Sequence, residues 1–171
     1  MTNLKDYREI TPEQLEKSPF QLIGHDWMLI SAEKDGKVNT MTASWGGLGV
    51  MWGKNVAFIV IRPGRYTKEF VDGSATLSLS FLPKEFKKQL GYLGSVSGRD
   101  EDKIAKSGLS VTHLDETPFF EEAELAIFCK KLFAQEYDPA SFLDPAIDEK
   151  WYPEKDYHTL YIGEITHILT K

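Results

Sequence analysis

Short stretches of alternating or continuous apolar residues recur along this chain, and both patterns predict strands. The continuous apolar run 56–61 is what a strand buried on both faces shows. Residues 75–82 alternate instead, with Leu77, Leu79 and Phe81 on one side and hydroxyls on the other, and predict a half-buried strand. The same patterns predict further strands from Phe20 onward and over 38–44, 109–113 and 157–169.

The pair Asp35-Gly36 is a strong hairpin signal, because both residues tolerate the positive φ angles of a tight two-residue turn. It predicts that 38–44 folds back along 28–33. The stretch that follows, 41–53, would then hang from the end of a rigid hairpin as a flexible loop.

Helix signals are short. The tetrapeptide Thr-Pro-Glu-Gln at 11–14 has a hydroxyl N-cap, a proline at the first helical position and a capping-box glutamine. A helix should therefore begin there and end before Pro19. Further short helices are expected over 66–71, 83–93 and 102–108, the first of them ended by Gly73.

Two segments leave the assignment open. Residues 122–136 fit helical spacing at some apolar positions and strand spacing at others, and we favour the strand. Residues 138–151 are polar and aromatic and contain proline, and they predict a loop with one helical turn. With six or seven strands and two or three helices, the chain is expected to be mainly β with α insertions, built as a small antiparallel Greek-key barrel.

The length suits a single domain, 1–171, with a helical extension at 1–19. Acidic residues outnumber basic ones, 26 to 20, and the net charge of −6 argues against a nucleic-acid partner. No run approaches the ~20 apolar residues of a membrane span. The first residues contain no apolar core of a secretion signal.

The residues of redox and metal chemistry are few. One cysteine, Cys129, excludes an internal disulfide and suits a reducing cytoplasm. A metal site is not expected, because no ligand spacing links the scattered histidines His25, His113 and His167.

Two chemically distinct stretches flank the apolar run 56–61. The first, 41–53, is rich in glycine and tryptophan, and glycine lets a backbone approach a flat ligand because no Cβ stands in the way. The second, 62–68, places three cations and a hydroxyl just before a predicted helix, as a phosphate group requires. The strand between them would span about 23 Å before any curl-back of the loops. Together they predict one site for a planar, phosphorylated cofactor, whereas singly they would be a solvated arginine pair and a tight turn.

The residue types suit each part of such a cofactor. A planar ring needs a flat apolar wall, for which the candidates are Trp45, Leu48 and Trp52. Backbone groups at 41–46, with the hydroxyls of Thr42 and Ser44, could match the polar ring edge and stabilise negative charge that grows there on reduction. The candidate phosphate donors are Arg62, Arg65, Tyr66 and Thr67.

Five motifs follow one another in order along the chain. They are Asn-Thr-Met-Thr-Ala-Ser-Trp-Gly from Asn39, Arg-Pro-Gly-Arg-Tyr-Thr from Arg62, Leu-Ser-Leu-Ser from Leu77, Ser-Gly-Arg-Asp-Glu-Asp-Lys from Ser97, and Tyr-His-Thr-Leu-Tyr-Ile-Gly-Glu-Ile from Tyr157. In this order and spacing they resemble the flavin reductase-like domain family with its FMN-binding split barrel, in the branch similar to flavoredoxin. The resemblance extends from Phe20 to Leu169.

The resemblance implies an antiparallel split β-barrel that forms a homodimer, with FMN near the subunit interface. The residues that it places at the ring and ribityl chain are Met41, Thr42, Ala43, Ser44 and Trp45. Those that it places at the phosphate are Arg62, Arg65, Tyr66 and Thr67, with Ser78 or Ser80 and Ser97 beside them. His158 matches a histidine that lies near the flavin or nicotinamide in related reductases, and it is the candidate catalytic residue. On the residues alone, Ser78 could face water and His158 could lie on a solvent-facing strand.

The activity that the resemblance implies is an FMN-dependent oxidoreductase that takes hydride from NAD(P)H as co-substrate, or electrons from another donor. The alternatives are a flavoredoxin-like electron carrier reduced by a protein partner and a flavin-binding module without a redox role. The chain has no G-x-G-x-x-G dinucleotide fingerprint, so NAD(P)H would have to stack directly on the flavin. The aromatic segment 138–156 is longer than a minimal reductase needs and could form a lid over the flavin.

Overall fold

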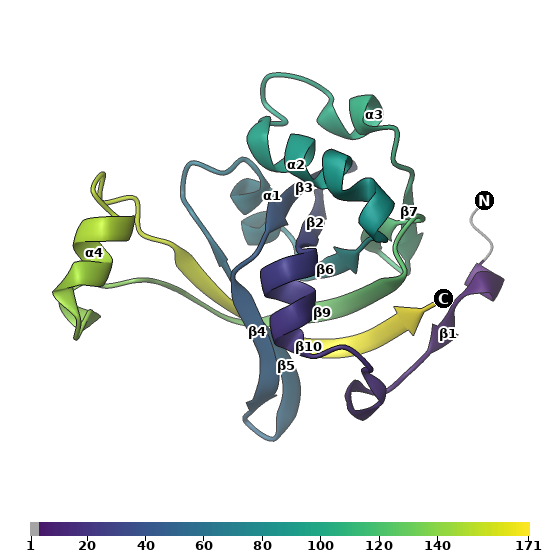
Figure 1. Ribbon diagram of the computed structural model, residues 1–171, viewed down its shortest axis with the longest axis horizontal. Helices are drawn as coiled ribbons and strands as arrows, with labels where there is room; N and C mark the ends of the chain where they lie inside the picture. Colours follow the sequence, from purple (N-terminus) through teal and green to yellow (C-terminus); the bar gives the residue numbers. More distant parts are fainter. Residues whose placement is uncertain (1–3) are drawn as a thin grey trace.

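The computed structural model describes residues 4–171, in which ten strands and four α-helices occur (Figure 1). The strands are β1 (Arg8–Glu9), β2 (Met28–Lys34), β3 (Lys37–Ala43), β4 (Gly46–Met51), β5 (Lys54–Ile61), β6 (Thr76–Phe81), β7 (Val111–Leu114), β8 (Thr117–Phe120), β9 (Leu125–Glu136) and β10 (Thr159–Thr170). The helices are α1 (Thr67–Gly73), α2 (Lys87–Ser95), α3 (Lys103–Ser107) and α4 (Pro145–Trp151). None of the helices described is long and apolar enough to cross a membrane.

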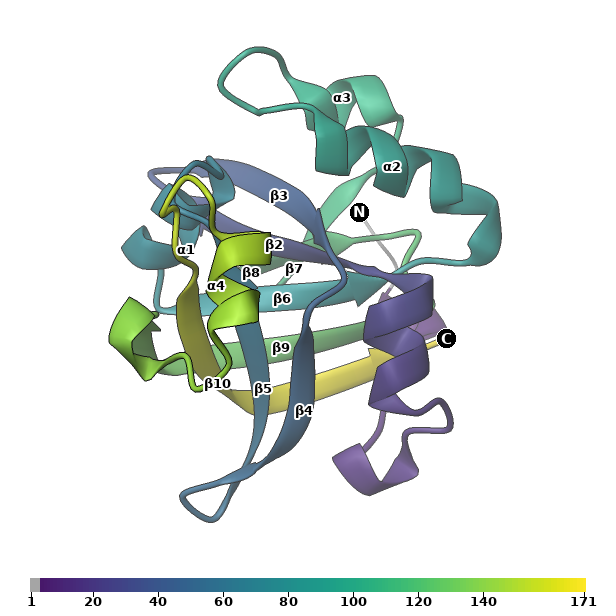
Figure 2. The same ribbon diagram turned by 60° about the vertical axis from the view of Figure 1, so that its left-hand side comes forward.

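One antiparallel sheet dominates the molecule, in the order β3-β2-β6-β9-β10-β5-β4, with β1 paired to β10. Its two end strands, β3 and β4, are consecutive in the chain but form no ladder with each other in the described residues. Figure 2 shows the sheet curling until these strands meet at their link and then diverge. The result is a barrel with an open seam, and it confirms the predicted mainly-β architecture with helical insertions.

The first hairpin forms as its turn residues predict. Asp35 and Gly36 have φ angles of 53° and 71°, and β2 pairs with β3 from Met28↔Ala43 to Lys34↔Lys37. The run 56–61 lies in β5 between β10 and β4, and its side chains are buried or half-buried, as predicted.

The stretch 41–53 was expected to be a loop, and this is wrong for most of its length. Residues 41–43 end β3, and 46–51 form β4, which pairs with β5 through a second tight hairpin at Trp52 and Gly53. These two residues have φ angles of 53° and 69°. Only Ser44 and Trp45 separate β3 from β4, so these strands are joined by a two-residue link.

The strand expected from Phe20 onward begins later, at Met28. Residues Phe20–Asp26 form a π-helix that packs against β4 beside the open seam (Figure 2). Leu22 and Ile23 are its buried residues, whereas Phe20 is 85% exposed. Upstream, the turn expected at 11–14 is present as the 3-10 helix Pro12–Gln14, in which the Thr11 N–H donates to Gln14 Oε1 at 2.9 Å.

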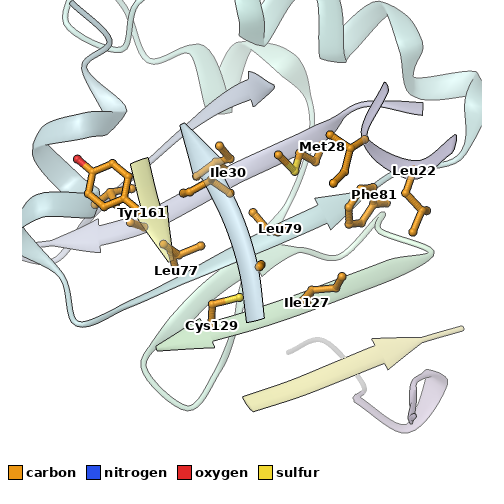
Figure 3. Close-up of a cluster of buried hydrophobic side chains, with 14 of the residues drawn as sticks. Leu22, Met28, Ile30, Leu77, Leu79, Phe81, Ile127, Cys129 and Tyr161 are labelled. Atoms are coloured by element: carbon orange, nitrogen blue, oxygen red, sulfur yellow. The ribbon is translucent and has the colours of Figure 1, made fainter. Parts of the chain in front are cut away.

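The barrel interior is apolar and closely packed (Figure 3). Side chains from β2, β6, β9 and β10 fill it, including Met28, Ile30, Leu77, Leu79, Phe81, Ile127, Cys129 and Tyr161. Burial raises the pKa of the Cys129 thiol to about 12, so this cysteine remains an unreactive core residue.

A second apolar layer attaches the helices to the outside of β2. Leu29 points away from the barrel interior and packs against Leu90 and Leu93 of α2. The helices expected over 83–93 and 102–108 are confirmed as the 3-10 turn Lys84–Phe86 with α2, and as α3. Gly108 ends α3 with a φ angle of 75°, as a helix C-terminal glycine does.

The prediction that 75–82 is half-buried is wrong, because both faces of β6 are covered. Ser78 and Ser80 have no exposed surface. The strand β8, which the sequence pattern did not reveal, lies against this face of β6. The Ser78 hydroxyl donates to the Pro118 carbonyl at 2.5 Å.

The ambiguous segment 122–136 contains strand β9, as favoured, and β9 pairs with β10 along nearly its whole length. Between these two strands lies the segment 138–157, which contains the 3-10 turn Pro139–Ser141 and α4 and is therefore more helical than expected. Figure 1 shows that it projects from the barrel, and we call it the β9–β10 insertion.

Candidate functional site

A cavity of about 210 Å³ lies where the β3–β4 link meets the end of β5. The residues that line it are Met41, Thr42, Ala43, Ser44, Trp45, Val60, Arg62, Arg65, Trp151 and His158. It therefore combines two arginines, two hydroxyls and three aromatic side chains. Another cavity, of about 290 Å³, lies beside the insertion, but it is lined by no cation. We place the candidate site in the first cavity, because its residues can recognise an anion.

Strand pairing brings the two halves of this site together. Because β4 is antiparallel to β5 and Gly46 lies opposite Ile59, the link at Ser44 and Trp45 comes beside the end of β5 and Arg62. The other hairpin turn lies at the opposite end of β5, where Trp52 contacts the Phe133 ring at 6.1 Å between centroids. Thus the first part of the predicted 41–53 stretch reaches the site and the last part does not.

The Arg65 side chain is held by one hydrogen bond, and some of its donors are free within residues 4–171. One guanidinium nitrogen, Nη1, donates to the Gly94 carbonyl at 2.8 Å, at the end of α2. Its Nε and Nη2 atoms have no hydrogen-bond partner in residues 4–171, and the side chain lines the cavity. A half-buried guanidinium with free donors is suited to bind a phosphate or carboxylate group.

Arg62 holds the β9–β10 insertion. Its Nη1 donates to Asp156 Oδ1 and its Nη2 to the Trp151 carbonyl, both at 2.8 Å. The guanidinium also lies over the Tyr152 ring, 4.9 Å from its centroid. Arg62 contributes positive charge to the cavity, but both of its terminal nitrogens already bind the insertion.

Trp151 brings the insertion to the cavity. Its ring meets the Trp45 ring edge to face, with centroids 4.9 Å apart. Neither Trp151 nor Val60 was singled out from the sequence. The only signal for Trp151 was its position within the segment 138–156, where a lid was predicted. That this segment closes over a ligand stays a prediction.

His158 lies in the cavity wall, so the alternative of a solvent-facing strand position is wrong. It is 7% exposed, its Nδ1 is 2.7 Å from the Tyr152 hydroxyl, and its ring centroid is 5.3 Å from that of Trp45. Burial, together with the positive charge of Arg62, lowers the pKa of His158 to about 4. The imidazole is therefore neutral near pH 7. In the tautomer that accepts a hydrogen bond from the Tyr152 hydroxyl at Nδ1, the imidazole proton is on Nε2.

This pKa predicts a specific pH dependence of stability. The pKa of His158 is about 6.5 in the unfolded chain and about 4 in the folded protein. The unfolded state therefore binds more protons between these values, so the free energy of unfolding increases as the pH rises from 4 to 6.5 and levels off above. Between pH 7.5 and pH 5 we expect the wild type to lose about 2 kcal/mol more than His158→Gln in urea denaturation. Equal losses in the two proteins would contradict a neutral buried imidazole.

Several predicted site residues lie outside the cavity. These are Tyr66, Thr67, Ser78, Ser80, Ser97, Leu48 and Trp52. The Thr67 hydroxyl is buried and accepts a hydrogen bond from Asn39 Nδ2 at 2.9 Å. The Ser97 hydroxyl accepts from the Arg99 N–H at 3.2 Å, and Ser80 Oγ accepts from the Phe120 N–H at 3.4 Å. The ring of Tyr66 lies under the Arg99 guanidinium, 4.7 Å away.

Comparison with models of protein families identifies one family. The profile of the flavin reductase like domain matches residues 20–171. A search of curated proteins found no match.

Similar solved structures share the fold. An FMN-binding domain of a flavin reductases-like enzyme from Shewanella baltica has a TM-score of 0.70 at 18% identity, over 96% of this chain and 76% of that one. Flavoredoxin from Methanosarcina acetivorans has a TM-score of 0.68 at 20% identity, and the match covers 96% of this chain and 75% of that one. Flavoredoxin of Desulfovibrio vulgaris has a TM-score of 0.66 at 22% identity, and the match covers 85% of this chain and 69% of that one.

Proposed function

The chain belongs to the flavin reductase-like domain family, and on that premise we propose that it is an FMN-binding oxidoreductase. It would pass hydride from NADH or NADPH, or electrons from another donor, through FMN to an acceptor. The observation that carries the proposal is the cavity of mixed character, in which free donors of Arg65 lie near aromatic side chains and the hydroxyls of Thr42 and Ser44.

The donor set suits the two ends of FMN. Arg65 would bind the phosphate with its free Nε and Nη2, while Arg62 adds positive charge nearby. Tyr66 and Thr67, with Ser78 or Ser80 and Ser97, lie outside the cavity, and we assign them no direct contact. At the ring end, the Thr42 hydroxyl donates to the Leu90 carbonyl at 2.6 Å, so it can only accept from a ligand. The Ser44 hydroxyl has no partner in the described residues and can donate.

Bound FMN would supply the redox chemistry, because its ring accepts a hydride or two electrons. The chain itself would bind and orient the FMN and exclude water from it. Trp45 and Trp151 form apolar walls, and residues 41–45 offer main-chain groups to the ring edge. His158 is neutral near pH 7, and in the tautomer that accepts from the Tyr152 hydroxyl it would offer an Nε2 proton to the ligand without changing charge.

We infer that the functional unit is a homodimer with FMN near the interface. A cavity of about 210 Å³ is smaller than the roughly 300–1,000 Å³ of most ligand sites, so a second subunit would complete its walls. Three apolar side chains of the insertion also remain exposed, Leu143 at 99%, Ile147 at 43% and Trp151 at 42%. The single buried cysteine suits the cytoplasm, where we place the protein.

A flavoredoxin-like electron carrier, reduced by a protein partner, is the second candidate. It is supported by the structural similarity to two proteins named flavoredoxin, although this likeness is one of fold. A carrier should hold its flavin tightly enough to retain it through gel filtration. A reductase that uses flavin as a substrate should exchange it.

The visible spectrum of the purified protein tests the proposal directly. We expect the absorption bands of bound flavin, either as isolated or after adding FMN, and NADH or NADPH oxidation above the buffer rate. Bound flavin without nucleotide oxidation would favour the carrier. A colourless protein that takes up no FMN in a titration would contradict both and favour a module without a redox role.

A further inference from the structure

Lys103 is a buried cation outside the cavity wall. It is 4% exposed, and its Nζ donates to the carbonyl oxygens of Leu93 and Val96, each at 2.9 Å. No carboxylate accepts a hydrogen bond from it within residues 4–171. Burying an ammonium group without a counter-charge is costly, so this arrangement calls for a reason beyond packing.

The carbonyls that Lys103 binds belong to the end of α2. The last carbonyls of a helix have no partner within the helix and carry partial negative charge. Lys103 binds the carbonyls of Leu93 and Val96, and Arg65 binds the Gly94 carbonyl between them at 2.8 Å. Two cations from separate elements therefore hold one four-residue turn.

The same helix end also holds the other side of the cavity. The Thr42 hydroxyl donates to the Leu90 carbonyl, one turn earlier in α2. Figure 2 shows α2 and α3 together above β3, and α2 contacts β3. Thus α2 fixes the positions of both Thr42 and Arg65, and Lys103 fixes the end of α2.

We propose that Lys103 is a positioning residue for the phosphate of the ligand. By holding the carbonyls of Leu93 and Val96, it fixes the Gly94 carbonyl and so directs the free donors of Arg65 toward the cavity. This inference rests on the proposed function, since it requires a phosphorylated ligand. A bound phosphate dianion would also supply the negative charge that the described residues do not provide for this pair of cations.

The electrostatic state of Lys103 supports the assignment. Burial, together with the positive charge of Arg65, lowers the pKa of Lys103 to about 8. In a lysine on the surface, far from other cations, neither burial nor a neighbouring positive charge would lower the pKa. The two charged groups are therefore coupled, as expected of two cations that act on one phosphate group.

The test compares FMN with riboflavin, which lacks the phosphate. For Lys103→Met we expect the dissociation constant of FMN to rise about tenfold, and that of riboflavin to change less than about twofold. Lys103→Arg should restore FMN binding. The matched control is Lys106→Met on the same helix, because the Lys106 side chain is 61% exposed and its ion pair within residues 4–171 is with Glu101.

A second variant keeps the test decisive if Lys103→Met folds poorly. Lys103→Gln retains a donor for the carbonyls and removes the charge, so it should lie between the wild type and Lys103→Met in FMN affinity. In the ligand-free protein, hydrogen exchange of the amides at 93–97 should be faster in Lys103→Met than in Lys106→Met.

The outcomes separate this inference from the proposed function. Equal FMN affinity in the wild type and Lys103→Met, or an equal loss for FMN and riboflavin, would overturn the positioning role alone. Unchanged exchange at 93–97 would do the same. A wild type that binds neither flavin would overturn the proposed function, and the inference with it.

Discussion

Arg65→Ala is expected to raise the dissociation constant of FMN by about 10- to 150-fold, because a charge-assisted phosphate contact is worth ~1.5–3 kcal/mol. Arg65 is the cavity arginine whose Nε and Nη2 remain free in the described residues. Fluorescence titration with FMN measures the change. Riboflavin, which has no phosphate, should bind the variant almost as it binds the wild type. The fold should survive, at a cost of about 1 kcal/mol for the unpaired Gly94 carbonyl.

The matched control is Lys54→Ala, at the other end of β5. Lys54 pairs with Glu164 at 2.8 Å, and its side chain is 44% exposed. Its loss removes the same formal charge from the chain far from the cavity, so FMN affinity should change little. If Arg65→Ala and Lys54→Ala behave alike, the phosphate does not bind at Arg65.

Gly46→Ala is expected to lower the free energy of unfolding by about 3 kcal/mol or more. Gly46 begins β4 with a φ angle of 145°, which an L side chain rarely adopts. An added Cβ would lie 2.3 Å from the Phe58 carbonyl oxygen, so the backbone of β4 or β5 would have to move. Because Gly46 follows the link at Ser44 and Trp45, FMN affinity should fall together with stability. Urea denaturation and FMN titration check both effects.

Gly47→Ala provides the neighbouring control. A Cβ at Gly47 would meet only the Phe58 ring at 3.6 Å, an ordinary contact. Its stability should stay within about 1 kcal/mol of the wild type, since alanine costs less backbone entropy than glycine in a strand. Equal destabilisation at both positions would show that the β4–β5 pairing tolerates no side chain there, and that the conformation of Gly46 is not the cause.

Local signals predicted the fold best where two or three residues determine a turn or a strand. Asp35-Gly36 specified its hairpin, and the run 56–61 its buried strand. The glycines at 46–51 predicted a loop, because glycine is uncommon within strands, but these residues form β4. The π-helix Phe20–Asp26 was also missed, since its short apolar pattern fits either structure.

Tertiary contacts decided which candidate residues reach the cavity. The hydroxyls of Ser78 and Ser80 alternate as a solvent-facing or ligand-facing edge would, but β8 covers them. No local pattern could show this, because β8 follows some forty residues later in the chain and contains Pro118. By contrast, Arg65 and the link at Ser44 were expected at one site and do line one cavity, because the pairing of β4 with β5 brings the link back to the end of β5.

The β9–β10 insertion leaves and re-enters the sheet at a single paired point, Glu136↔Thr159. The pairing of β9 with β10 therefore holds the two ends of the insertion together, and the barrel does not depend on the length of the insertion. Trp151 and the partners of Arg62 belong to the β9–β10 insertion, whereas Arg65 and Ser44 belong to the barrel. Substitutions within this one insertion can thus change the residues that face the outer half of the cavity, while Arg65, Ser44 and the framework of the barrel stay as they are.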